Sequence, residues 1–192
     1  MFAAWRALGA RYDTAALQPF EWPASGGAGP DWPALREWCT AQPALRFAVA
    51  RVGPGEGAAA RAAAVALKLD GSVQLQAAHG ALGRFAMRLR VKLHDMLGGL
   101  AAKRSCIWDS GWVPPEPSAW AALMQFKPRR PTLIVMQGLP PGEVQRLLVA
   151  LQSRSAGFLR PVRVLLIDPA RGDMAAEPPT VLALPSSLSA TQ

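Results

Sequence analysis

Short, continuous apolar runs that alternate with helix-forming segments most strongly constrain the fold of this chain. The run Leu-Ile-Val-Met at residues 133–136, for example, is bounded by polar residues and is too short for a helix of ordinary length. Such a run is typical of a strand that is buried on both faces, as in parallel sheets. Strands that alternate with helices predict an α/β fold, here a three-layer sandwich with a mostly parallel central sheet of about five strands.

Each expected element has a residue range, and the chain divides into three parts. The expected strands are residues 45–52, 131–136 and 161–167, with further candidates at 72–76 and 181–184. The expected helices are residues 2–10, 31–42, 58–68, 81–100, 118–126 and 140–154. Residues 108–112, followed by two prolines, are expected to form a loop. We expect an N-terminal helix and flexible connection (1–30), an α/β domain (31–170) and a Pro- and Ser-rich tail (171–192).

The charge of the chain favours acidic partners. Lys and Arg number 21 against 13 Asp and Glu, which gives a formal net charge of +8 over 192 residues. Such a balance suits nucleic acid, nucleotide phosphates, an anionic membrane or an acidic protein surface. The excess of Arg over Lys would equally follow from a GC-rich bacterial genome, so the charge alone does not select among these explanations.

Several classes of protein are disfavoured by the sequence. No apolar run approaches the roughly 18 residues that would span a bilayer. The N-terminus lacks a clear signal-peptide pattern. The two cysteines, Cys39 and Cys106, are too few for a disulfide framework and lack the spacing of metal ligands. We therefore expect a cytoplasmic protein without a metal or a cofactor.

A glycine-rich turn follows the first expected strand and precedes an Ala-rich helix. It reads Gly53-Pro54-Gly55-Glu56-Gly57 and continues as Ala58-Ala59-Ala60-Arg61. A phosphate-binding loop in this context has a last Gly, then a Lys that reaches the β and γ phosphates, then a Ser or Thr that binds Mg²⁺. Three alanines stand at those positions. The local structure of a phosphate-binding loop is thus predicted without its chemistry.

Several segments in order resemble the STAND-type P-loop NTPases, the signal-transduction ATPases with numerous domains. The matching segments are Leu35-Arg36-Glu37-Trp38-Cys39, residues 46–52, Gly53-Pro54-Gly55 with Arg61, residues 129–135 and residues 162–166. The resemblance covers about residues 10–170. It implies a P-loop NTPase fold, with residues 131–136 as the strand that carries the Walker B carboxylate in that family. Gln137 stands at the position of that carboxylate.

The departures from the family pattern imply a catalytically inactive domain. Phosphoryl transfer depends on the Lys, the Mg²⁺-binding hydroxyl and the Walker B carboxylate for electrostatic stabilisation, and all three are replaced here. The residues assigned to the degenerate Walker A loop are Gly53, Gly55, Glu56, Gly57, Ala59, Ala60 and Arg61, and Gln137 is assigned to the degenerate Walker B strand. No catalytic and no metal-binding residue is predicted.

A protein of this kind is expected to act by binding. The first hypothesis is a regulator, adaptor or inhibitor that contacts a protein partner, either an active NTPase or another acidic protein. The second is a basic protein that associates with nucleic acid through residues 84–104, and a weaker third is nucleotide binding without hydrolysis. The candidate anion or partner contacts are Arg84, Arg88, Lys92, Arg104, Arg129 and Arg130.

Overall fold

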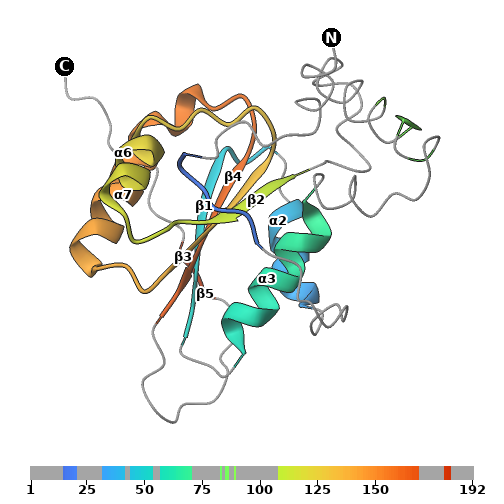
Figure 1. The fold of residues 1–192 in the computed structure, drawn as a ribbon, viewed down its shortest axis with the longest axis horizontal. Coiled ribbons are helices and arrows are strands. Elements are labelled where there is room, and N and C mark those ends of the chain that lie inside the picture. The colour runs from blue at the N-terminus through green and yellow to red at the C-terminus, as the bar shows by residue number, and fades with distance from the viewer. Residues whose placement is uncertain are drawn as a thin grey trace.

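Five strands form one sheet with helices on both faces (Figure 1). The structure is a computed structural model that describes residues 15–20, 32–41, 44–53, 57–70, 108–168 and 180–182, together with the helical residues Gly83, Phe85, Ala86 and Leu89. In chain order the elements are α2 (Pro33–Thr40), β1 (Phe47–Val52), α3 (Ala58–Leu69), β2 (Asp109–Trp112), α6 (Pro117–Met124), β3 (Thr132–Gln137), α7 (Pro141–Arg154), the 3-10 turn η2 (Ser155–Gly157), β4 (Val162–Ile167) and β5 (Thr180–Leu182).

The strands lie in the order β2-β3-β4-β1-β5. Strands β1 to β4 are all parallel, and β5 pairs with β1 in the antiparallel direction. The parallel strands begin nearly level, because Phe47 and Thr132 both pair with Val162 and Asp109 pairs with Thr132. The mostly parallel sheet predicted from the sequence is therefore confirmed, and the candidate edge strand near residue 181 is present as β5.

Alternate residues of the central strands enter two separate cores. In β4, Val162, Val164 and Leu166 pack with α6 and α7, whereas Leu165 and Ile167 pack with α2 and α3. Figure 1 shows these helix pairs on opposite sides of the sheet. The architecture is the predicted three-layer α/β sandwich. Burial on both faces explains why residues 164–167 of this strand form a continuous apolar run rather than an alternating one.

Three of the helices begin with proline. Pro33, Pro117 and Pro141 occupy the first positions of α2, α6 and α7. A proline there loses no helical hydrogen bond, since the first amides of a helix have no partner within it, and its fixed φ suits the helix. The predicted helices at 31–42, 58–68, 118–126 and 140–154 are present with ends shifted by a few residues.

The expectation of a loop at residues 108–112 is wrong, because residues Asp109–Trp112 form β2 at the edge of the sheet. This strand has the sequence Asp-Ser-Gly-Trp and contains no apolar run. Its polar residues are buried by specific partners instead: Ser110 is hydrogen-bonded to Asp70, and Asp109 to Arg130. A pattern based on hydrophobicity could not identify such a strand.

A short N-terminal segment lies along the outer edge of β2. Gln18 and Trp112 form an antiparallel bridge, with hydrogen bonds between their backbone groups in both directions (N···O 2.9 and 3.0 Å). Ala16 and Leu17 are buried in the core beside α6 and α7. This segment therefore pairs with part of an edge that would otherwise present open backbone groups.

Several expected elements lie wholly or mostly outside the described residues. They are the helix at 2–10, the strand at 72–76 and the tail at 171–192, apart from β5. Of the expected helix at 81–100, four residues are described; all are helical, and the side chains of Phe85 and Leu89 are 54% and 47% exposed. Among the helices described, none combines the length and the apolar character needed to cross a membrane.

Cys39 offers a direct test of the packing between α2 and the sheet. Burial raises the pKa of its thiol to about 12, and the guanidinium of Arg163 opposes part of that rise. The thiolate is the reactive form. In a Cys106→Ser background, we expect a thiol reagent at about pH 8 to leave folded protein unmodified and to react quickly with urea-unfolded protein. Equal labelling rates in the two states would contradict the buried position of Cys39.

Candidate functional site

Strands β1 and β4 are neighbours, and the connections that follow them lead to opposite edges of the sheet. From β1 the chain crosses to β2 at one edge, whereas from β4 it continues past β1 to β5 at the other edge. In open α/β sheets, ligands bind at such a switch point, outside the carboxyl ends of the strands. The glycine-rich turn that follows β1 therefore lies at the position where a ligand site is expected in this fold.

The turn joins β1 directly to the N-terminus of α3. Gly53 follows the last residue of β1, and Gly57 precedes Ala58 with a φ of 78°, a left-handed conformation that favours glycine. The first hydrogen bond of the helix runs from Arg61 N to Gly57 O (2.8 Å), so the amides of residues 58–60 precede the helical ladder. Gly55 and Glu56 lie outside the described residues. The predicted strand and helix are present in this order, with Gly53 and Gly57 as the described residues between them.

The alanine side chains in the first turn of α3 add no charged or hydrogen-bonding group beside the glycine turn. Ala59 is half-buried and Ala60 is exposed, and neither carries a polar group. The Arg61 guanidinium lies over the ring of Trp32, with its Cζ 5.1 Å from the ring centroid. This cation–π contact joins α3 to the start of α2. Arg61 therefore makes a contact between helices in this structure.

Gln137 lies at the same end of the sheet as the glycine turn. It is the last residue of β3 and is exposed. Gln137 pairs with Ile167 of β4, and Ile167 pairs with Val52 of β1. Two strand spacings separate β3 from β1, or about 10 Å. The two segments assigned to the degenerate Walker motifs thus end on one edge of the sheet, with β4 between them.

Two carboxylates near this edge, among the residues that the structure describes, are paired with arginines. Asp168, directly after β4, has an Oδ1 atom 3.4 Å from Nε of Arg51, and its amide donates to Val52 O (3.1 Å). Glu143, in the first turn of α7, forms an ion pair with Arg146 at 2.8 Å. Within the described part of the chain, no group of three or more His, Cys, Asp or Glu residues is arranged to hold a metal ion.

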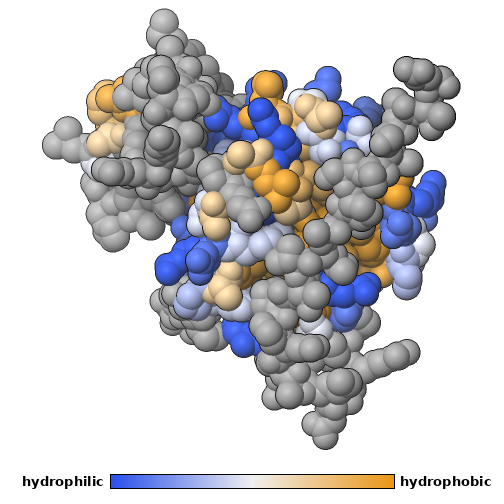
Figure 2. All heavy atoms as spheres, turned by 180° about the vertical axis from the view of Figure 1, so that it is seen from behind, coloured by the Kyte–Doolittle hydropathy of each residue, from blue (hydrophilic) through white to orange (hydrophobic). Residues whose placement is uncertain are grey.

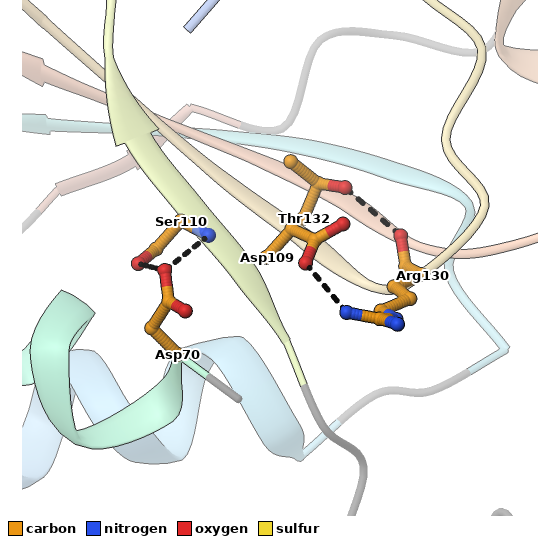
Figure 3. Close-up of polar contacts among 5 residues, drawn as sticks. All are labelled: Asp70, Asp109, Ser110, Arg130 and Thr132. Carbon is orange, nitrogen blue, oxygen red and sulfur yellow. Dashed lines mark hydrogen bonds and ion pairs between the residues drawn. The ribbon is translucent and has the colours of Figure 1, made fainter. Parts of the chain in front are cut away.

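A second set of polar residues is buried at the amino end of β2, away from the edge of the sheet that carries the glycine turn (Figure 3). The amide and hydroxyl of Ser110 are both within hydrogen-bond distance of Oδ2 of Asp70, at the C-terminal end of α3 (3.3 and 2.9 Å). Arg130 Nη1 donates to Oδ1 of Asp109 at 3.2 Å, and Thr132 Oγ1 donates to Arg130 O at 2.9 Å. These contacts join α3, β2 and the start of β3, which is a structural role.

Arg129 and Arg130, the two candidate partner contacts that precede β3, differ in their exposure to solvent. Arg130 is 2% exposed and takes part in the buried ion pair with Asp109, whereas Arg129 is exposed. The other candidates (Arg84, Arg88, Lys92 and Arg104) lie outside the described residues. A buried ion pair leaves the Arg130 guanidinium inaccessible to a partner in this conformation.

Sequence reasoning missed the pair formed by Arg51 and Asp168. Arg51 interrupts the apolar sequence of β1 at a position where the burial pattern shows one exposed residue between buried ones. In the sequence, Asp168 directly precedes Pro169, which is typical of a turn and gives no sign of a partner. The one signal that could have joined them is the parallel register of β1 and β4, which requires the pairing of the strands to be known.

Comparisons of this chain with protein-family models, curated proteins and solved structures find no significant match. The fold, the glycine turn and the residues around it are therefore the basis for an assignment of function.

Proposed function

We propose that this chain is a catalytically inactive protein of the P-loop NTPase type that acts by protein–protein contact as a regulator, adaptor or inhibitor. One observation carries the proposal: β1 and the N-terminus of α3, joined by a glycine-rich sequence, lie at the switch point of the sheet, at the same edge as the end of β3. In a P-loop protein, reactive groups would stand at the positions of Ala59, Ala60 and Gln137. The resemblance of the sequence to STAND-type NTPases supports the same assignment.

The expected loss of nucleotide binding follows from the charges that are missing. Lys and Mg²⁺ supply most of the positive charge that a triphosphate meets in a phosphate-binding loop. Here the first turn of α3 offers backbone amides and the methyl groups of Ala58, Ala59 and Ala60. Amides at a helix N-terminus provide only a partial positive charge, and the carboxylate of Glu56 in the loop opposes it. Contact with another protein is therefore the use that remains for a fold that lacks these charged groups.

The proposal is tested first by calorimetry with ATP and Mg²⁺. We expect no saturable binding up to about 1 mM nucleotide, which corresponds to about 4 kcal/mol of binding free energy. Micromolar affinity without turnover would instead support the weaker hypothesis of nucleotide binding without hydrolysis. Turnover that is lost on substitution of Gln137 or Arg61 would overturn the assignment of an inactive protein.

A restored variant tests whether the turn is a degenerate phosphate-binding loop. We expect the combination Ala58→Gly, Ala59→Lys, Ala60→Thr and Gln137→Asp to improve ATP–Mg²⁺ affinity by at least about tenfold, or 1.4 kcal/mol. The matched control has Met in place of Lys at position 59, which keeps the length of the side chain but not its charge. If the restored variant folds, as judged by circular dichroism, and binds no better than this control, the P-loop assignment is wrong.

A further inference from the structure

The amino end of the parallel sheet, opposite the glycine turn, carries a mixed basic and aliphatic surface. We call the set Leu45, Arg46, Lys127, Leu159 and Arg160 the amino-edge patch. These residues come from the segments that lead into β1, β3 and β4. In Figure 1 the amino ends of the strands point upward, and Figure 2 shows orange and blue atoms mixed along the upper side of the described part of the molecule.

Backbone pairing brings two of these segments together before the strands begin. The amide of Val162 donates to Arg46 O (2.8 Å), so Arg46 lies beside Pro161. Pro161 is the residue that directly follows Arg160. The amide of Thr132 donates to Pro161 O (2.9 Å), which places Pro131 and the start of β3 on the other side of Pro161; Lys127 belongs to the segment that leads into this strand. The level start of the strands therefore gathers residues that are far apart in the sequence.

Aliphatic side chains are exposed within this basic surface. Leu159 is 82% exposed, which is the largest value among the large hydrophobic residues described, and Leu45 is 43% exposed. Scattered surface leucines need no explanation, but two of them from neighbouring segments beside several cations form a mixed patch. A partner that covers the patch would remove aliphatic surface from water as well as bind charge.

The charge of the patch is of one sign. Residues 44–46, 124–131 and 154–161 contain six Lys or Arg residues and no Asp or Glu: Arg46, Lys127, Arg129, Arg130, Arg154 and Arg160. Arg130 is neutralised inside by Asp109. The remaining cations favour an anionic partner, and arginine predominates among them. The planar guanidinium binds carboxylates and phosphates through two parallel hydrogen bonds, which a lysine cannot do.

Hydrogen bonds from buried and surface arginines hold the patch in place. Arg46 Nη1 donates to Phe158 O, next to Leu159. Arg163, fully buried below, donates through Nη1 to Leu45 O at 2.8 Å. The segments 45–46 and 158–160 are thereby joined before any partner binds. A surface that is already ordered loses less conformational entropy on binding.

We propose that the amino-edge patch docks an acidic protein segment that combines carboxylates with one or two aliphatic side chains. The carboxylates would pair with Arg46, Lys127 and Arg160, and the aliphatic side chains would cover Leu159 and Leu45. Exposed leucines favour a protein over nucleic acid, because bound single strands stack their bases on aromatic side chains and phosphates offer no apolar contact. This proposal rests on the proposed function in that it takes protein contact as the mode of action, and it names the chemistry of the partner.

The test uses a short fluorescein-labelled peptide of Glu, Leu and Ala as the probe, with fluorescence anisotropy at physiological salt. We expect saturable binding by the full chain that weakens at least about tenfold with Gln in place of Glu, or with Ser in place of Leu, in the peptide. The double variant Leu159→Ser and Arg160→Glu should lose about tenfold in affinity as well. Arg146→Glu, which reverses a charge in α7 outside the patch, is the matched control and should bind as the unchanged protein does.

A measurement on the unchanged protein makes the test independent of the folding of any variant. In ¹H–¹⁵N spectra, addition of the peptide should shift the amide signals of residues 44–46 and 158–160 and those of Lys127 and Arg129. Shifts confined to other residues would overturn the proposal, as would equal binding of the Gln peptide. Tighter binding of an oligothymidine or of phosphatidylserine vesicles that is lost in the double variant would assign the patch to nucleic acid or lipid instead. None of these outcomes depends on the ATP measurements, so the two proposals can fail separately.

Discussion

Replacing Arg130 by Ala should lower the free energy of unfolding by about 3–5 kcal/mol. The substitution removes the guanidinium that pairs with Asp109 and leaves that carboxylate with only 12% of its side chain exposed. An unpaired buried charge loses its hydration without compensation, which is why breaking such a pair costs more than the pair itself contributes. Urea unfolding followed by circular dichroism measures the change.

Two controls separate the buried ion pair from a general effect of removing a cation. Lys127→Ala, at an exposed position of the same segment, should change the stability by no more than about 0.5 kcal/mol. A double variant with Asp109→Leu and Arg130→Met removes both charges and should recover much of the loss, because two apolar side chains leave no buried charge. A loss below about 1 kcal/mol for Arg130→Ala would contradict a stabilising buried ion pair between Arg130 and Asp109.

Gly111→Ala should destabilise the protein by about 1–3 kcal/mol, because β2 and the N-terminal segment are in close contact at this residue. A Cβ atom at Gly111 would lie 2.7 Å from Gln18 O and 2.9 Å from Cβ of Leu17. Both distances are shorter than van der Waals contact, and the first involves backbone. The segment that contains Leu17 would have to move away from β2 and expose part of the buried surface.

Gly142→Ala is the matched control for this prediction. Gly142 lies in the first turn of α7, where an added Cβ would have no atom within 4 Å. Replacing a helical glycine by alanine stabilises a protein by about 0.4–1 kcal/mol where the backbone conformation permits it. The two Gly→Ala variants should therefore shift the urea midpoint in opposite directions. A shift of the same sign and size in both would contradict the contact between Gly111 and Gln18.

The sequence was sufficient to predict the elements that are built from one kind of residue. Residues 133–136 of β3 and 164–167 of β4 are continuous apolar runs because these strands are covered on both faces, and α7 has leucines on one side because only that side is buried. Strand β2 could not be predicted in this way. Its burial depends on Asp70 and Arg130, which lie 40 and 21 residues away from their partners Ser110 and Asp109.

The candidate site was predictable in part for the same reason. The glycine turn is a local feature, and its position between β1 and α3 follows from adjacent segments of the sequence. The pairing of Arg51 with Asp168 and the gathering of Arg46, Leu159 and Arg160 depend on the register of β1 and β4. A recurrent signal did exist, since an arginine stands shortly before each of β1, β3 and β4. Its meaning becomes clear only when the three strands are known to be parallel and level.

The junction between Asp70 and β2 has a consequence for how this chain can vary. Asp70 and Trp108 form a bridge, and Trp108 N donates to Leu69 O, so the two ends of the connection at 71–107 lie side by side. The entropy lost on closing a loop grows only with the logarithm of its length, so the length of the connection at 71–107 has little influence on the cost of bringing its ends together. A change in the length of this connection should therefore add little to the entropic cost of forming the bridge between Asp70 and Trp108.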